Sequence, residues 1–493
     1  MFRFSHDRGF VLRAVASMFV MNLLASSVTA QIFVPSSEAP NVETAYDLAS
    51  EGATITLSGK THTIDETLDA AGMNLRVVGQ VDSTGTPITT IDGQGLRRIL
   101  IVQSGEDSTT VYENIRFANG FAFGESGGAV QVSNADPRFV NCVFEGNDAA
   151  FKGGALHIFG SNAEVAILGC RFVSNAVANG IAGSGGALAI EQQCEVEISD
   201  STFLQNRAGT GGAMWSGDSV FRVERSAFEG NIADSTAGAV HMSGGDLSVL
   251  ESRFDDNHAV GLAGGAMLLA SAQTQIQQCW FDGNSSAQSG GAVQTLGSGS
   301  WCGIDQSEFT GNVSGDDGGA LSLNYASTVV VESLFIGNSA ANDGGAIEII
   351  NAAVRLEDVE GIGNSAAVGG FLRQNGGSLE LIGSEVTGNL ATGTGGLHLM
   401  AGSTTDLRQT SVCDNDNEEI LGSWNDLGDN CVADDCGCAC PADFDGDGVV
   451  NGSDFGLLIS AWGSGSGPED LNGDGQVDAI DLGLLLALWG PCS

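Results

Sequence analysis

One phrase recurs along most of this chain, and residues 280–293, WFDGNSSAQSGGAV, show it in full. A phenylalanine is followed three residues later by an asparagine, and then by Gly-Gly-Ala or a close variant. The asparagines recur about every 27 residues, a period typical of solenoids, at positions 119, 147, 175, 206, 231, 257, 284, 312, 338, 364, 389 and 415. The glycine pair keeps the same phase, beginning at positions 127, 153, 185, 211, 264, 290, 318, 344, 369 and 395, with the variant AGA at 237. The chain is therefore predicted to stack similar coils, each packed against its neighbours.

The residues after each glycine pair indicate which kind of solenoid this is. Counted from the second glycine, the second residue on is apolar, from Val130 to Leu372, and the third is frequently polar. Alternation with a period of two is typical of strands. Parallel strands joined coil by coil make right-handed crossovers. We therefore predict an all-β solenoid, a right-handed parallel β-helix of about 11–14 coils, followed by a small α-helical domain.

The repeated residue types have structural explanations in such a helix. Equivalent residues of stacked coils lie about 4.8 Å apart, so one aromatic column is expected in the core, formed by Phe144, Phe172, Phe203, Phe228, Phe254, Phe281, Phe309 and Phe335. The asparagines tolerate a left-handed bend, and their amides can hydrogen-bond from coil to coil. Each glycine pair permits a corner where a side chain would clash with the next coil. A catalytic role for these residues is not expected.

The N-terminus predicts export. Arg3, Arg8 and Arg13 precede an apolar run, and Val28-Thr29-Ala30 supplies the small residues that a signal peptidase reads, so residues 1–30 are predicted to be a cleaved signal peptide. The run is shorter than the ~20 residues that a membrane-spanning helix needs, and no later segment is long and apolar enough. The net charge of -43 argues against a nucleic-acid partner. We expect a secreted, cell-surface or outer-membrane-associated protein without a transmembrane segment after cleavage.

The segments on either side of the repeats differ in character. Residues 31–109 are predicted to form an N-terminal cap and the first coils, with a short helix at about 42–49 before the first long strand. Residues 110–415 form the repetitive β-helix, and residues 416–440 are a Cys-rich acidic linker. Residues 441–493 form a separate domain. A cap is expected because the first coil would otherwise expose a sheet end.

The last domain contains two 12-residue patterns of a calcium-binding loop. Acidic or amide residues, or a backbone carbonyl, stand at positions 1, 3, 5, 7, 9 and 12 of such a loop, with glycine at position 6. The first loop supplies Asp443, Asp445, Asp447, the carbonyl of Val449, Asn451 and Asp454. The second supplies Asp470, Asn472, Asp474, the carbonyl of Gln476, Asp478 and Asp481. Each loop is followed by an apolar, helical run. An Asp-Gly-rich linker, which is the alternative explanation, would not contain such a run. The pattern predicts two bound Ca²⁺ ions.

Three resemblances follow from these motifs. The paired FxxN and GGA[ILV] elements of residues 110–415 resemble the repeat of polymorphic outer-membrane proteins, which implies a β-helical surface adhesin. The segments NVETAYDLASEGATITLSGKTHTI at 41–64 and TTIDGQGLRRILIV at 89–102 resemble the N-terminal cap and first coils of pectate-lyase-like β-helices. The paired loops resemble a type I dockerin, an EF-hand-like domain, which implies a cohesin-like or cell-surface protein partner. Loop positions 10 and 11 hold Gly452-Ser453 and Ala479-Ile480. Cellulosomal dockerins often have hydroxyl residues there, which argues against a standard cohesin.

The cysteines leave two pairings open. Cys142 and Cys170 lie at the same position of adjacent coils, so they are expected either to form a disulfide or to be buried free thiols. Cys440 and Cys492 bracket the two calcium loops, and we expect a disulfide between them. A zinc site in the sequence CGCAC at 436–440 is the alternative.

The polar row after the glycine pairs bears on catalysis. It consists of Gln131, His157, Ala189, Trp215, His241, Leu268, Gln294, Ser322, Glu348 and Arg373. It is expected to face outward and to hold no carboxylate cluster, with Glu348 and Arg373 as a surface ion pair. His157 and His241 are about 14 Å apart by the strand spacing, and Trp215 is a candidate for stacking on a sugar ring. The sequence thus favours a non-catalytic surface, adhesion or structural protein that binds carbohydrate or protein. The alternative is a secreted polysaccharide lyase or glycoside hydrolase.

Overall fold

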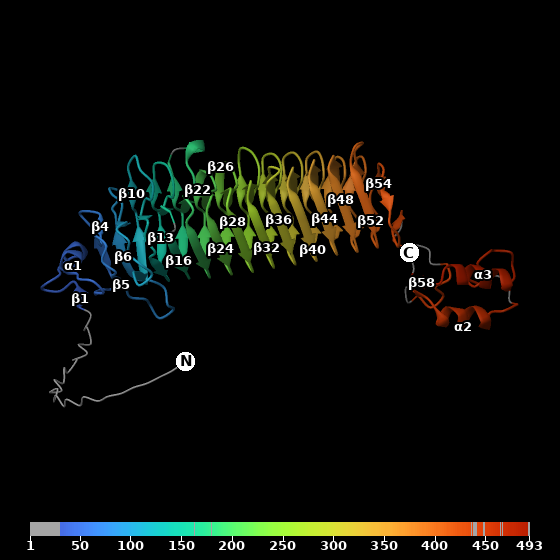
Figure 1. Cartoon of the computed structure of the whole chain (residues 1–493), viewed down its shortest axis with the longest axis horizontal. Helices are drawn as coiled ribbons and strands as arrows, with labels where there is room; N and C mark the ends of the chain where they lie inside the picture. Colours follow the sequence, from blue (N-terminus) through green and yellow to red (C-terminus); the bar gives the residue numbers. More distant parts are fainter. Residues whose placement is uncertain are drawn as a thin grey trace, which may run out of the picture.

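The computed structural model describes residues 30–161, 163–178, 180–434, 436, 441–446, 449–463, 465 and 467–491. The predicted signal peptide, apart from its last residue, lies outside this part. Strands stack along one axis from the N-terminal end (Figure 1). They form parallel sheets of 16, 15, 14 and 11 strands, which confirms the predicted parallel β-helix. With up to 16 strands in a sheet, the solenoid is somewhat longer than predicted.

A single coil shows how the repeat folds. It contains β27 (Val240–Ser243), β28 (Asp246–Leu250), β29 (Arg253–Asp255) and β30 (His258–Ala259), one strand for each of the four sheets. The next coil begins with β31 (Met267–Ala270), which pairs with β27 in parallel register, 27 residues away. The observed period is therefore one turn of the solenoid.

The phenylalanine column is confirmed. From Phe144 to Phe335, successive ring centroids lie 4.6–4.9 Å apart and the ring planes are within 7° of parallel. All eight rings are fully buried. Phe117 extends the column by one coil, 5.1 Å from Phe144. This stack is the centre of the continuous core.

The column ends where a glycine replaces the phenylalanine. Gly361 pairs in register with Phe335, so the stack lacks a ring in that coil. Phe371 fills the space: its ring meets Phe335 edge-on at 6.2 Å, and a Cβ on Gly361 would lie 2.3 Å from it. Phe371 stands where other coils have the alanine of Gly-Gly-Ala. The phenylalanine of the GGF variant therefore compensates for the phenylalanine that is missing at Gly361.

The asparagines form a buried ladder, as predicted. From Asn147 to Asn389, each side-chain Nδ2 donates to the Oδ1 of the asparagine in the next coil at 2.8–3.0 Å. The expected left-handed bend is wrong for these residues, because it is the preceding residue that has positive φ, as at Asp256 before Asn257. Asn119 is itself left-handed and sits one residue before the ladder position, which Gly120 occupies.

The glycine pairs act as expected. The first glycine has positive φ, for example 59° at Gly153. A Cβ on the second, Gly154, would lie 2.1 Å from the carbonyl oxygen of Gly186 in the next coil. Backbones approach closely at this corner, and only glycine fits there.

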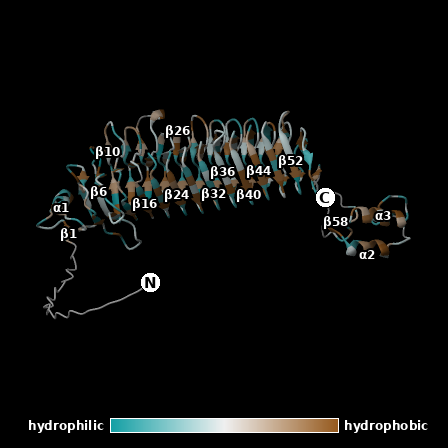
Figure 2. Ribbon diagram, viewed as in Figure 1, coloured by the Kyte–Doolittle hydropathy of each residue, from teal (hydrophilic) through white to brown (hydrophobic). Residues whose placement is uncertain are grey.

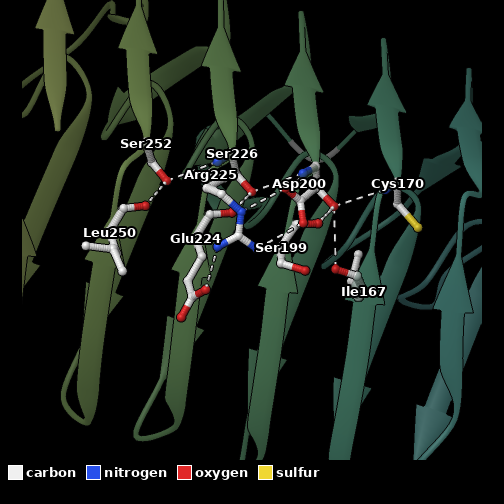
Figure 3. A network of polar contacts seen from close by, with 10 residues as sticks. Ile167, Cys170, Ser199, Asp200, Glu224, Arg225, Ser226, Leu250 and Ser252 are labelled. Atoms are coloured by element: carbon white, nitrogen blue, oxygen red, sulfur yellow. Dashed lines mark hydrogen bonds and ion pairs between the residues drawn. The ribbon is translucent and has the colours of Figure 1, made fainter. Parts of the chain in front are cut away.

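A second polar column explains the buried cysteines. The hydroxyl of Ser226 accepts the N–H of Ser201, and the hydroxyl of Ser252 accepts the N–H of Ser226, both at 3.1 Å (Figure 3). Cys170 and Cys142 occupy the same position in earlier coils, and the N–H of Cys142 donates to the Cys170 Sγ at 3.4 Å. Both thiols are free and buried. The disulfide alternative is thus wrong: the Cys170 sulfur accepts a hydrogen bond where other coils place a hydroxyl, and the Cys142 thiol donates to the carbonyl of Tyr112 at 3.3 Å.

The two ends of the solenoid are closed differently. Helix α1 (Val42–Leu48), one residue shorter than predicted, is capped by Asn41 and buries Val42, Ala45 and Tyr46 in the core. At the other end β54 (Ile420–Leu421), β55 (Asn425–Asp426) and β56 (Cys431–Ala433) extend the sheets into the predicted linker. A disulfide joins Cys413 to Cys436, a pair that the sequence had not singled out. It ties this last coil to the one before it.

The C-terminal domain is a small unit with its own core. Helices α2 (Gly452–Ser460) and α3 (Ala479–Ala487) contact each other, and β57 (Val449–Val450) pairs with β58 (Gly490–Pro491). Its buried apolar residues are only Ala442, Val450, Leu458, Val477 and Leu485 among those described. None of the helices in the described ranges has the length and apolarity needed to cross a membrane.

Candidate functional site

The first predicted calcium loop gathers its carboxylates. Ligand oxygens of Asp443, Asp445 and Asp454 lie within 4.8 Å of one another. Asn451, at position 9, donates its Nδ2 to the carbonyl of Val449 at 2.9 Å. Carboxylate oxygens at these separations match a Ca²⁺ ion, whose bonds to oxygen are about 2.3–2.6 Å long. The described residues therefore fit the predicted ion, while Asp447 lies outside the described part.

The second loop is held by hydrogen bonds to its carboxylates, but its described residues do not bring three carboxylates as close together as those of the first loop. The carboxylate of Asp470 accepts the N–H groups of Asp474 and Gly475, at 3.2 and 2.8 Å. Asn472 donates its Nδ2 to Asp474 at 3.0 Å, and the N–H of Gln476 donates to Asp474 at 3.0 Å. These hydrogen bonds fix the turns of the loop, and its residue pattern is that of a calcium loop.

Positions 9 and 12 of each loop also begin the following helix. Asn451 and Asp478 are the N-caps of α2 and α3, and Asp454 and Asp481 complete a capping box with them. Hydrogen bonds from backbone N–H groups lower the pKa of Asp481. Burial raises the pKa of Asp454, but the N–H groups of Asn451, Phe444 and Asp445 outweigh it and lower the pKa overall. The calcium-loop pattern assigns these residues to the metal alone, but the S/T/D/N-x-x-D spacing also signals a helix start.

The two helices expose a row of apolar side chains. In Figure 2 the ribbons of α2 and α3 are brown, the colour of hydrophobic residues, along much of their length. The exposed residues are Phe455, Ile459 and Trp462 after the first loop, and Ile480, Leu484, Leu486, Leu488 and Trp489 after the second. Trp462 and Trp489 are 47% and 51% exposed and occupy equivalent positions, 27 residues apart. So many large exposed apolar side chains on so small a domain make it a candidate site of protein interaction.

The expected outward row of the solenoid is mostly covered. Of its ten residues only Gln131, Trp215, His241 and Arg373 are partly exposed, and the other six are buried. The chain before each glycine pair folds over this row, as Ala237 and Ala263 do where they pack on Leu268. His157 pairs with Glu191, and His241 contacts Thr236, so the two histidines have separate partners.

The row itself holds one carboxylate, Glu348, as expected, but two residues outside the row complete a carboxylate cluster with it. Asp317 and Asp343 precede their glycine pairs and meet Glu348, with ligand oxygens within 4.8 Å of one another. Arg373 pairs with Asp343 at 2.9 Å and with Glu348 at 3.2 Å. Glu348 is 1% exposed, so its pair with Arg373 is buried rather than on the surface. The sequence DGGA occurs twice, at 317–320 and 343–346, and was the signal for stacked aspartates.

The surroundings of this cluster disfavour its negative charges. Burial, together with the charge of Asp317, raises the pKa of Glu348 to about 8. Burial and the neighbouring Asp316 and Asp343 raise the pKa of Asp317 to about 6. The cluster is therefore short of positive charge despite Arg373.

Trp215 lies in a second group of polar residues. It lines a hollow of about 480 Å³ together with Ser161, Glu191, Gln192, Gln193, Gly217 and Asp218. Lys152 Nζ lies 4.4 Å from the centre of the Trp215 ring and 2.5 Å from Glu191. A hydrogen bond from His157, aided by Lys152, lowers the pKa of Glu191 to about 2. An aromatic ring beside polar groups is an arrangement that suits a sugar.

The depressed pKa of Glu191 predicts a pH-dependent contribution to stability. Glu191→Gln is expected to reduce the free energy of unfolding by about 1–2 kcal/mol at pH 7. The wild-type advantage is present above the ordinary glutamate pKa of 4.5 and is lost as the pH falls toward about 2. Urea unfolding of both proteins at pH 7 and pH 3 measures it. Glu195→Gln, at an exposed ion pair, is the control and should change little at either pH. The prediction would be contradicted if Glu191→Gln lowered the free energy of unfolding by the same amount at both pH values.

The described residues define a parallel β-solenoid with a C-terminal domain of paired calcium-loop motifs. Residues 441–488 match the dockerin type I domain, and residues 332–349 match the Chlamydia polymorphic membrane protein repeat. Two of the three predicted resemblances, to the polymorphic outer-membrane protein repeat and to the type I dockerin, are thereby confirmed for these segments. Dockerin type I domains bind calcium, and the cluster in the first loop agrees with this.

Two further proteins are similar to parts of this chain. Metabotropic glutamate receptor-like protein P of Dictyostelium discoideum is 29% identical over 215 residues, 42% of this chain. The aligned region is 14% of the length of that protein. A mannuronic acid specific polysaccharide family 6 lyase from human gut microbiota covers 77% of this chain and 86% of the lyase at 11% identity, with a TM-score of 0.35. This likeness is too distant to indicate a function.

Proposed function

We propose that this chain is an exported, non-catalytic β-solenoid that a calcium-loaded C-terminal domain attaches to a partner protein outside the cell. The observation that carries the proposal is the convergence of three carboxylates in the first loop, together with the exposed apolar side chains that follow both loops. The dockerin match supports it, because dockerin domains bind cohesin partners. Each loop binds one Ca²⁺, two per domain, and cleavage of a signal peptide precedes function.

The partner is proposed to bind the exposed apolar residues of α2 and α3. Calcium acts indirectly, because each loop sets the start of the helix that follows it through its capping box. Loss of the ion would let both helices shift. The partner is a cohesin-like protein whose binding surface accommodates the apolar Ile480. This residue is at position 11 of the second loop, where hydroxyl residues are common.

The docking surface is tested by removing its two tryptophans. The double variant Trp462→Ala/Trp489→Ala is expected to lose at least 100-fold in affinity, because buried interface tryptophans each contribute about 2–4 kcal/mol. Binding of the full chain to a panel of cohesin domains, in Ca²⁺ and in EDTA, provides the measurement. Trp280→Ala/Trp301→Ala is the matched control, since both residues are exposed on the solenoid at 41% and 38%. Equal losses in both double variants, or binding in EDTA, would contradict the proposal.

The solenoid is proposed to bind carbohydrate at the hollow beside Trp215. The Trp215 ring supplies a stacking surface, and Glu191 and Asp218 supply hydrogen-bond acceptors around it. Glycan-array binding of the full chain, compared with Trp215→Ala, tests this, and an unchanged pattern would remove Trp215 from the site.

Cleavage is not expected, although carboxylates and an arginine meet on the solenoid. Glu348 is buried, and Arg373 is held by two carboxylates, so neither is placed to reach a polysaccharide. Incubation with pectin or alginate should therefore yield no unsaturated or reducing ends. Steady product formation that Glu348→Gln abolishes would instead support the polysaccharide lyase or glycoside hydrolase alternative.

A further inference from the structure

We propose that the solenoid holds a Ca²⁺ ion of its own, bound by Asp317, Asp343 and Glu348 and independent of the C-terminal loops. Asp317 precedes β39 (Leu321–Asn324), while Asp343 precedes β43 (Ile347–Ile350), in which Glu348 lies. These strands are neighbours in the 14-stranded sheet, so the coil stacking itself brings the carboxylates together. One oxygen from each lies within 4.8 Å of the others. That spacing matches oxygens around one Ca²⁺ with bonds of about 2.3–2.6 Å.

An unpartnered oxygen points to a ligand at this place. Glu348 is 1% exposed, and its Oε2 has no hydrogen-bond partner anywhere in the described chain. Its Oε1 is 3.2 Å from Arg373 Nη1. A buried carboxylate oxygen left without a partner is costly, because it has lost its water and gained nothing in return. A cation bound to Oε2 would remove that cost.

The other two carboxylates also have an oxygen to spare. The Asp317 Oδ1 accepts the N–H of Asp343 at 3.1 Å, and the Asp343 Oδ2 pairs with Arg373 at 2.9 Å. The second oxygen of each is therefore left for another ligand. Three protein oxygens satisfy part of the six to eight positions that Ca²⁺ requires, and water can supply the rest.

The charges of the cluster match a divalent ion. When all three carboxylates are ionised, as they are when bound to a cation, they and the guanidinium of Arg373 leave an excess of two negative charges. Asp316, whose Oδ1 accepts from Asn342 at 2.5 Å, adds to this excess. His398 follows Arg373 in register on β51 (Leu397–Leu399). Asp343 is 23% exposed, so an ion can reach the cluster from solvent even though Glu348 is buried.

The test counts bound calcium in the full chain. Equilibrium dialysis against ⁴⁵Ca²⁺ at millimolar concentration should give one ion fewer per chain for Glu348→Gln and for Asp317→Asn than for the wild type. Glu360→Gln, an exposed acid on β45 (Glu360–Ile362), is the matched control and should keep the wild-type count. The C-terminal loops are the same in the wild type and the three variants. If those loops fail to bind calcium, the number of bound ions falls equally in all four proteins, so this outcome differs from loss of the solenoid site.

Thermal unfolding of the solenoid, followed by its β-sheet circular dichroism, gives a second readout. Ca²⁺ should raise the wild-type Tm by at least about 2 °C, as expected for a ligand of the folded state, and should not raise that of Glu348→Gln. In EDTA the variant should unfold at the wild-type temperature or above, because it lacks the buried charge. Wild-type ion counts in both site variants, or a Glu348→Gln protein less stable than wild type in EDTA, would overturn the proposal.

Discussion

Replacing Phe228 by alanine is expected to destabilise the solenoid by about 3–5 kcal/mol, the range for loss of a fully buried phenylalanine. Phe228 lies in the middle of the stack, 4.7 Å from both Phe203 and Phe254, and is 0% exposed. The coils above and below hold the backbone in place, so the cavity cannot collapse. Denaturant unfolding of the two proteins measures the difference.

Phe123 provides a matched control for this substitution. Its ring is 86% exposed, so Phe123→Ala should change the free energy of unfolding by less than about 0.5 kcal/mol. A loss below about 1 kcal/mol for Phe228→Ala would show that the column does not carry the stability of the core. A larger loss at Phe123 than at Phe228 would mean that the burial pattern itself is wrong.

Chelating calcium is expected to unfold the C-terminal domain and leave the solenoid folded. The domain has five fully buried apolar residues in its described part, too few to offset the conformational entropy of about 50 residues. Its loops also concentrate carboxylates, whose repulsion the ions neutralise. In EDTA, α-helical circular dichroism and protease resistance of residues 441–491 should be lost, while the β-sheet signal persists.

Single substitutions in the first loop give a finer version of the same prediction. Asp443→Ala is expected to weaken calcium binding more than Asn451→Ala, because a charged direct ligand is lost rather than a neutral contact. Asn451→Ala should add a cost in helix stability of about 0.5–2 kcal/mol, since Asn451 caps α2. Calorimetry on the full chain and thermal unfolding separate the two effects. Calcium affinity that is unchanged in Asp443→Ala would remove the first loop from the metal site.

Much of the architecture could be predicted from the sequence alone. The period of about 27 residues defines one coil, and alternation after each glycine pair defines its strands. Identical residues at one phase must stack, so the phenylalanine column, the asparagine ladder and the glycine corners followed directly. The calcium loops were equally accessible, because their ligands lie within twelve consecutive residues and need no tertiary contact to converge. The Cys440–Cys492 disulfide and Asp447 stay predictions, since these residues lie outside the described part.

Contacts between different phases of the repeat were decided only by the tertiary structure. Phe371 fills the place of a ring missing at Gly361, ten residues earlier in the chain. Cys170 takes a hydrogen-bonding role that serine has in the next coil. Asp317 meets Glu348 because the chain before each glycine pair folds over the row that follows it. A periodic sequence determines which residues stack on their equivalents, since stacking repeats at every coil. The periodic sequence does not determine how a variable turn folds across the surface of a coil. That fold depends on packing between residues at different positions of the repeat.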